Sequence, residues 1–167
     1  MRHSTIPLIS AFILALAAGG AQAQDGVEEA FQQWRSNCPA PGENTTRPCV
    51  IYTQNGLATD AGPLGARIAL GPDSSQQMAL VIELIHAQQS TGFGLGVDGQ
   101  EPLLASLPSC SGDICRGSIT GATANDLIEQ FGAGDEATIS YIAADQRQVR
   151  IDLSLIGFTA AYNSITQ

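Results

Sequence analysis

Residues 149–155 read VRIDLSL, and an aliphatic residue occupies every second position of this stretch. A period of two places the aliphatic side chains on one face and the polar ones on the other, which is typical of a half-buried strand. Upstream, residues 138–142 read TISYI, whose β-branched and aromatic side chains also favour a strand. Polar residues 145–147 lie between the two segments, so the sequence predicts an antiparallel hairpin.

Further strands follow from similar patterns. Residues 78–87 read MALVIELIHA, an apolar run that periodicity alone leaves open between helix and strand. Turn-forming residues on both sides of it and several β-branched residues within it favour a long buried strand. Weaker strands fit residues 50–53, 67–70, 93–97, 103–107 and 115–120. We therefore expect an all-β domain, an antiparallel β-sandwich or barrel-like fold of about eight strands.

One short helix is expected near residues 124–131. Thr123 is placed to cap it, and Asp126 follows in the acidic first turn that suits a helix N-terminus. Gly132 favours the end of the helix. The apolar face is formed by Leu127, Ile128 and Phe131. The helix is predicted to be a connector that packs on the edge of the sheet.

The first 23 residues have the pattern of a secretory signal peptide. A basic start precedes an apolar run over residues 6–18, and residues 21–23 read AQA, which fits a signal peptidase site. The run of about 13 residues is too short to span a bilayer as a stable helix. We expect export to the periplasm, the outer membrane or the medium, with residues 24–167 as a single mature domain without a membrane segment.

The chain is acidic, with 7 Lys and Arg residues, 16 Asp and Glu residues and a net charge of −9. None of the basic residues is lysine. Such a surface repels phosphate backbones and anionic lipid head groups. We therefore expect neither nucleic-acid binding nor electrostatic binding to membranes.

The four cysteines are best interpreted as two disulfides, because an even number in an exported protein is typical of structural bridges. Three pairings are possible, and closeness in sequence favours Cys38–Cys49 and Cys110–Cys115. Each bridge would contribute roughly 2–3 kcal/mol in the chain-entropy model. The spacings lack both the two-residue step of zinc sites and a redox C-x-x-C pair. No metal or cofactor is expected.

Residues 92–99 read GFGLGVDG, which resembles a phosphate-binding loop at first sight. A dinucleotide fingerprint needs G-x-G-x-x-G between a strand and a helix. Here the spacing is G-x-G-x-G, and a turn signal with Pro102 follows. The stretch predicts a strand entering a turn, with glycines that admit a neighbouring backbone or a bulge.

Catalytic residues are not evident. His86 is the single histidine after residue 3, and Glu83 precedes it by three positions. On a strand these two side chains point to opposite faces, and they would share a face on a helix. We expect no catalytic site; the alternative is a hydrolase-type site around Glu83 and His86. Trp34 is interpreted as a core residue rather than a binding aromatic.

Several features occur together along the chain. They are Trp34 and Cys38, Cys49 after a proline-rich loop, Leu64-Gly65, Val97-Asp98-Gly99, the Cys110–Cys115 pair, and the closing residues 154–161, SLIGFTAA. Over about residues 31–162 this arrangement resembles the invasion-associated locus B family of exported bacterial proteins. The chain departs from the family pattern at Ile114, where a glycine is usual. The resemblance implies an exported all-β domain without known catalytic residues, and a role in host-cell entry.

The functional hypothesis is a non-catalytic exported protein that binds a protein or envelope partner. Open sheets present unpaired backbone groups, so an edge strand or the loops are expected to carry the binding. Host-cell association is the role that the resemblance suggests. The alternatives are the enzyme described above and a structural or stress-related component of the cell envelope.

Overall fold

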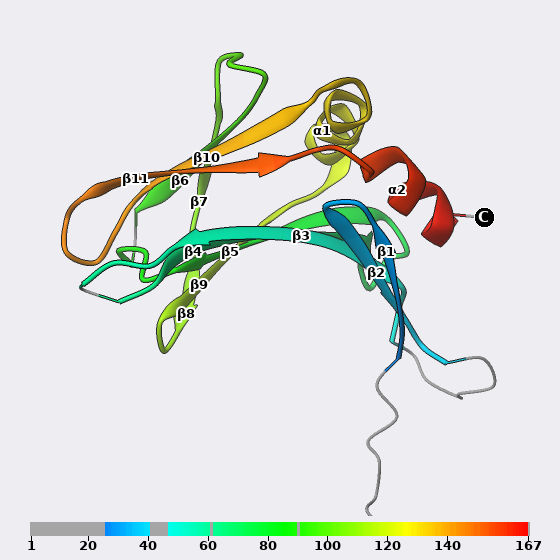
Figure 1. The fold of residues 1–167 in the computed structure, drawn as a ribbon, viewed down its shortest axis with the longest axis horizontal. Coiled ribbons are helices and arrows are strands. Elements are labelled where there is room, and N and C mark those ends of the chain that lie inside the picture. Colours follow the sequence, from blue (N-terminus) through cyan, green and yellow to red (C-terminus); the bar gives the residue numbers. More distant parts are fainter. Residues whose placement is uncertain (1–25, 41–46, 61, 90, 167) are drawn as a thin grey trace, which may run out of the picture.

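The computed structural model describes residues 26–40, 47–60, 62–89 and 91–166. Within these residues the chain forms eleven strands in two stacked antiparallel sheets, with two helices at one end (Figure 1). The predicted signal peptide lies outside the described residues. The all-β prediction is confirmed, and the two sheets form a sandwich rather than one closed barrel.

The larger sheet has seven strands. Their order is β1 (Val27–Phe31), β2 (Trp34–Cys38), β3 (Val50–Leu57), β4 (Leu64–Pro72), β5 (Met78–Ile85), β9 (Ile114–Ile119) and β8 (Ser109–Ser111). The smaller sheet has four strands, in the order β11 (Gln148–Ser154), β10 (Glu136–Ile142), β6 (Gly92–Val97) and β7 (Leu103–Ser106). The predicted hairpin is β10–β11, in which Ile139 lies opposite Ile151.

Every strand predicted from the sequence is present, but the number rises from about eight to eleven. The additional strands are β1, β2 and β8. Strand β1 reads VEEAF and is mostly exposed, and β8 has three residues, so neither carries a clear period-two pattern. They form because they pair with neighbours at the two edges of the larger sheet.

The core lies between the sheets and is built from alternate residues of the central strands. Its fully buried members include Ile51, Ile68, Leu80, Ile82, Leu84, Ile139 and Leu153. Burial of each such side chain contributes about 1.5–3 kcal/mol relative to exposure. This alternation directs the remaining side chains of the larger sheet to its outer face.

Strand β6 explains the glycine-rich stretch. Phe93, Leu95 and Val97 point into the core, and the glycines alternate with them on the other face. A Cβ atom on Gly92 would lie 2.5 Å from the carbonyl oxygen of Ala105 on β7. The prediction of a strand that enters a turn and admits a neighbouring backbone is therefore confirmed.

The predicted helix exists as α1 (Gly121–Ala133), but its expected ends were wrong. Thr120 is the N-cap residue, makes no capping hydrogen bond through its side chain, and is followed by no acidic residue in the first turn. Thr123 lies inside the helix. The helix ends at Ala133, and the N–H of the C-cap residue Gly134 donates to the carbonyl oxygen of Gln130. Its buried face, which includes Ala124, Leu127 and Phe131, packs on β5 and on the second helix. Strand β5 lies inside the larger sheet, so the prediction that the helix packs on the sheet edge was wrong.

The second helix, α2 (Phe158–Thr166), was not predicted. It joins α1 through an aromatic cluster around Trp34, which is fully buried. The Trp34 ring centroid lies 5.0 Å from that of Phe158 and 6.3 Å from that of Phe131. The Trp34 indole N–H donates to the carbonyl oxygen of Ser154 at 3.2 Å. The interpretation of Trp34 as a core residue is confirmed.

Candidate functional site

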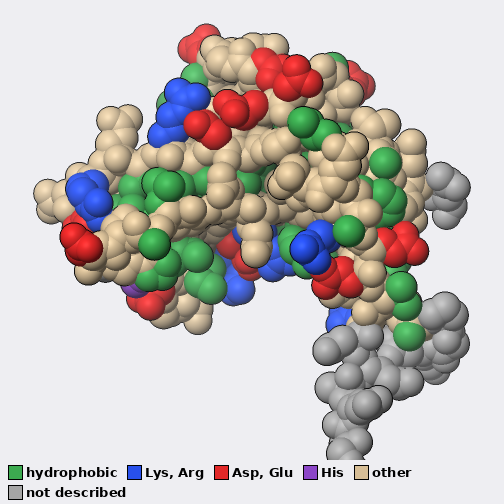
Figure 2. Space-filling view, in the orientation of Figure 1, with side chains coloured by type: hydrophobic (Ala, Val, Ile, Leu, Met, Phe, Trp, Pro, Cys, Tyr) green, Lys and Arg blue, Asp and Glu red, His purple; other side chains and the backbone are tan. Residues whose placement is uncertain are grey.

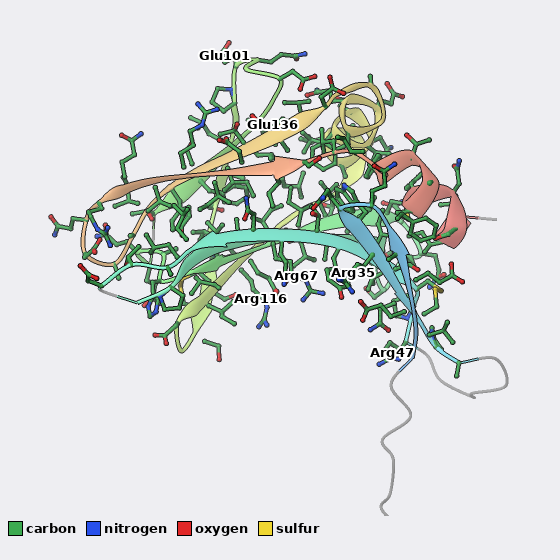
Figure 3. All side chains as sticks on the ribbon, in the orientation of Figure 1. Arg35, Arg47, Arg67, Glu101, Arg116 and Glu136 are labelled. Carbon is green, nitrogen blue, oxygen red and sulfur yellow. A yellow bond between two sulfur atoms is a disulfide. The ribbon has the colours of Figure 1, made fainter. Side chains whose placement is uncertain are left out.

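The outer face of the larger sheet, which points away from the smaller sheet, carries the most distinctive polar cluster. Pairing places Gln54, Arg67, Glu83 and Arg116 side by side on four neighbouring strands. We call these four residues the arginine row. Figure 3 shows Arg67 and Arg116, together with Arg35 of β2, on the side of the larger sheet away from the smaller one. Figure 2 shows basic side chains grouped on the same side.

Glu83 is the centre of the arginine row. Its Oε1 accepts a hydrogen bond from Arg116 Nε at 2.7 Å, and its Oε2 accepts one from Arg67 Nη1 at 3.3 Å. The Glu83 side chain is 18% exposed, whereas that of Arg116 is 51% exposed. Burial alone would raise the pKa of Glu83, but the hydrogen bond from Arg116 and the charges of both arginines outweigh it and lower the pKa. Glu83 is therefore ionised at neutral pH.

Arg67 lies between Tyr52 and Glu83, and its Nη1 donates a hydrogen bond to Glu83. Its guanidinium carbon lies 4.3 Å from the centroid of the Tyr52 ring, a cation–π contact. Its Nε atom is buried and has no hydrogen-bond partner within the described residues. Beside it, Arg35 Nη1 forms an ion pair with Glu28 at 2.6 Å. The contacts with Tyr52 and Glu83 orient Arg67, whereas the Arg35–Glu28 pair is exposed to solvent.

A groove of about 620 Å³ lies against the arginine row. Its lining includes Gly56, which is directly paired with Gly65 across β3 and β4, so neither strand presents a side chain at this pair. The other lining residues are Gln54, Asn55, Leu57, Ala58, Pro63, Leu64, Ala66, Arg67, Glu83, Ile85 and Ile114. We call this the outer groove. It has a charged side at Arg67 and Glu83 and an otherwise largely apolar lining.

The structure gives Glu83 and His86 different partners. Glu83 contacts the two arginines, whereas His86 follows β5 with φ +53° and places Nδ1 3.5 Å from Asp113 Oδ1. Glu83 and His86, the acid–base pair of the enzyme alternative, therefore do not contact each other directly. Within the described ranges, no group of three or more His, Cys, Asp or Glu side chains is arranged to hold a metal ion.

Both disulfides link neighbouring antiparallel strands of the larger sheet. The structure joins Cys38, the last residue of β2, to Cys49, the residue before β3, and it joins Cys110 to Cys115, which are opposite each other on β8 and β9. This is the pairing that closeness in sequence favoured. Neither bridge is part of the arginine row.

The sequence of this chain matches the model of one protein family. The model of the invasion associated locus B (IalB) protein matches residues 34–166. The chain belongs to the IalB family. This is a family of exported bacterial proteins and not a known enzyme family. Among curated proteins, none matches the chain.

A solved structure from the IalB family shows the same fold. The chain is similar to invasion associated protein B from Bartonella henselae, with 16% sequence identity and a TM-score of 0.61. The match covers 84% of this chain and 96% of that one. No helix in the described part of this IalB family member is long and apolar enough to cross a bilayer.

The arginine row was missed by the sequence analysis. A signal was present, because Glu83 interrupts the apolar run of residues 78–85. Its partners lie 16 residues before it and 33 residues after it in the sequence. The strand register that brings them together is a property of the whole sheet, so no local pattern identifies the cluster.

Proposed function

We propose that this protein is an exported, non-catalytic binding protein that holds its partner on the outer face of the larger sheet. In this proposal residues 1–23 are removed as a signal peptide, and residues 24–167 form the mature domain. The observation that carries it is the arginine row with the adjoining outer groove. Three of the seven arginines in an acidic chain gather on this one face.

The chemistry of this face suits recognition. Arg and Tyr are enriched among residues that dominate binding energy at protein interfaces. Arg67 is stacked on Tyr52 and paired with Glu83, so it loses little conformational entropy when a partner binds. Because the rest of the chain is acidic, an anionic partner would be drawn to this face.

The smaller sheet has an edge that is less suited to binding by strand addition. Its edge strand β11 already accepts hydrogen bonds from the larger sheet, from Asn55 Nδ2 to the Asp152 carbonyl and from Trp34 Nε1 to the Ser154 carbonyl. These contacts occupy two backbone groups that an added strand would need. This favours the face of the larger sheet over that edge.

Two matched variants test the proposal. Arg116→Glu reverses a half-exposed charge in the arginine row, and Arg150→Glu reverses a more exposed charge on the smaller sheet. We expect Arg116→Glu to abolish capture of the partner by cross-linking in cells and Arg150→Glu to preserve it. Equal capture by both variants would place the binding surface elsewhere. A hydrolase activity that disappears with His86→Ala would favour the enzyme alternative.

Protease treatment of intact cells tests the location. Digestion on whole cells would place the protein outside and support a role in host-cell association, the role that the family name suggests. Protection until the outer membrane is opened would assign it to the periplasm, where an envelope partner is expected.

A further inference from the structure

We infer that the outer groove binds a free fatty acid, with the carboxylate at Arg67 and the alkyl chain along the apolar lining formed by Leu57, Ile85 and Ile114. The inference deepens the proposed function and rests on it, because it names the ligand of the same face.

The shape of the outer groove suits a narrow apolar chain. A Cβ atom on Gly65 would lie 3.2 Å from Ile85 Cδ1, so the Ile85 side chain covers this glycine and gives the groove an apolar surface there. The volume of about 620 Å³ falls within the range of small-molecule sites. Leu57 lines the groove and is 54% exposed, so it offers apolar surface that a ligand would cover. Burial of such surface is favourable by about 0.8 kcal/mol for each CH₂ group.

The charged side of the groove carries guanidinium N–H donors that Glu83 does not use. Each guanidinium carries five N–H groups in a fork that matches a carboxylate. Glu83 accepts one hydrogen bond from Arg67 and one from Arg116. Two positive charges therefore share one carboxylate, which leaves a net charge of +1. The buried Arg67 Nε has no hydrogen-bond partner among the described residues. A carboxylate is the group that this arrangement accepts best.

The lining beyond the arginine row favours an alkyl chain over a peptide. The neighbouring cross-strand row consists of Gly56, Gly65, Ile85 and Ile114. None of these side chains forms hydrogen bonds, and Asn55 already donates to the Asp152 carbonyl. A peptide in this position would leave backbone N–H and C=O groups without partners, which is costly when they are buried. An alkyl chain has no such groups.

Octanoate is the probe that tests the inference. Titration of the mature protein, followed by NMR and calorimetry, should show saturable binding with shifts at the groove residues. Acetate lacks the apolar chain, 1-octanol lacks the charge, and octylamine carries the opposite charge. Each should bind at least about tenfold more weakly than octanoate, a difference of about 1.4 kcal/mol. Absence of saturable octanoate binding, or equal binding of octanoate and 1-octanol, would overturn the inference.

Two exposed leucines provide matched variants. Leu57 lines the groove, and Leu104 is 79% exposed on the smaller sheet. We expect Leu57→Asp to weaken octanoate binding about tenfold and Leu104→Asp to leave it unchanged. Equal effects of the two variants on octanoate binding would overturn the inference. The inference would also be overturned if the protein self-associates and Leu57→Asp abolishes that self-association, because a second copy of the chain would then cover the groove.

Partner capture by the same proteins separates the two proposals. If octanoate does not bind but Arg116→Glu still abolishes capture, the fatty-acid inference fails and the proposed function stands. If octanoate binds as expected but Arg116→Glu leaves capture intact, the groove is a ligand site and the partner docks on another surface.

Discussion

Replacement of Glu83 by glutamine perturbs the arginine row with the smallest change in volume. The amide oxygen keeps one hydrogen bond, but the charge shared by Arg67 and Arg116 is lost. Hydrogen bonds to charged groups contribute about 1.5–3 kcal/mol. Arg116 is half-exposed, so solvent screening places its share at the low end. We expect the free energy of unfolding at pH 7 to fall by about 1–2 kcal/mol, which lowers the Tm by roughly 2–8 °C.

The pH dependence identifies the cause of this loss. The pKa of Glu83 in the folded protein lies below its ordinary value of 4.5. A lowered pKa stabilises the folded state above the unfolded-state pKa, and this contribution is lost as the pH falls through the folded-state pKa. The difference between the wild-type protein and Glu83→Gln should therefore be largest at neutral pH and should narrow below about pH 4.5.

Urea unfolding followed by circular dichroism at pH 7 and at pH 3.5 provides the assay. Asp145→Asn is the control, because Asp145 pairs with Arg147 on an exposed turn and its loss should change the midpoint far less. If the Glu83→Gln difference is the same at both pH values, the loss comes from packing and the electrostatic reasoning is wrong.

Four further results are expected. Trp34→Phe should lower the free energy of unfolding by about 1–3 kcal/mol, because it removes the partly buried hydrogen bond to the Ser154 carbonyl and leaves a void at a fully buried site. Gly92→Ala should be destabilising by about 1–3 kcal/mol, because its Cβ meets the Ala105 carbonyl; an unchanged Tm would refute the close approach of β6 and β7. Gly132→Ala should instead raise stability by about 0.5–1 kcal/mol, because this position is inside α1 and open. Peptide mapping without reduction should join each cysteine only to its nearest neighbour in sequence; a peptide that links the two pairs would contradict the structure.

The helices show where local signals were sufficient and where they were not. The apolar face of α1 was readable, but its start was not, because Thr120 and Thr123 are equally plausible caps by residue type. The buried or partly buried positions 158, 161, 162 and 165 of α2 do follow a helical period. Only positions 158 and 161 of this period lie within the closing stretch 154–161 that carries the family resemblance, and that stretch by itself predicts no helix.

The sequence by itself determined the strands with a clear period of two, the turn after β6 and the family, because each depends on neighbouring residues or on motifs in order along the chain. It favoured one of three cysteine pairings, and the structure shows that pairing. Only the tertiary structure decided the arginine row and the outer groove. Residues 54, 67, 83 and 116 meet because four strands pair in one register, and a slip of one residue would turn a strand's side chains to the opposite face. Register is specified by packing of the whole core between the sheets, and it therefore has no local signature.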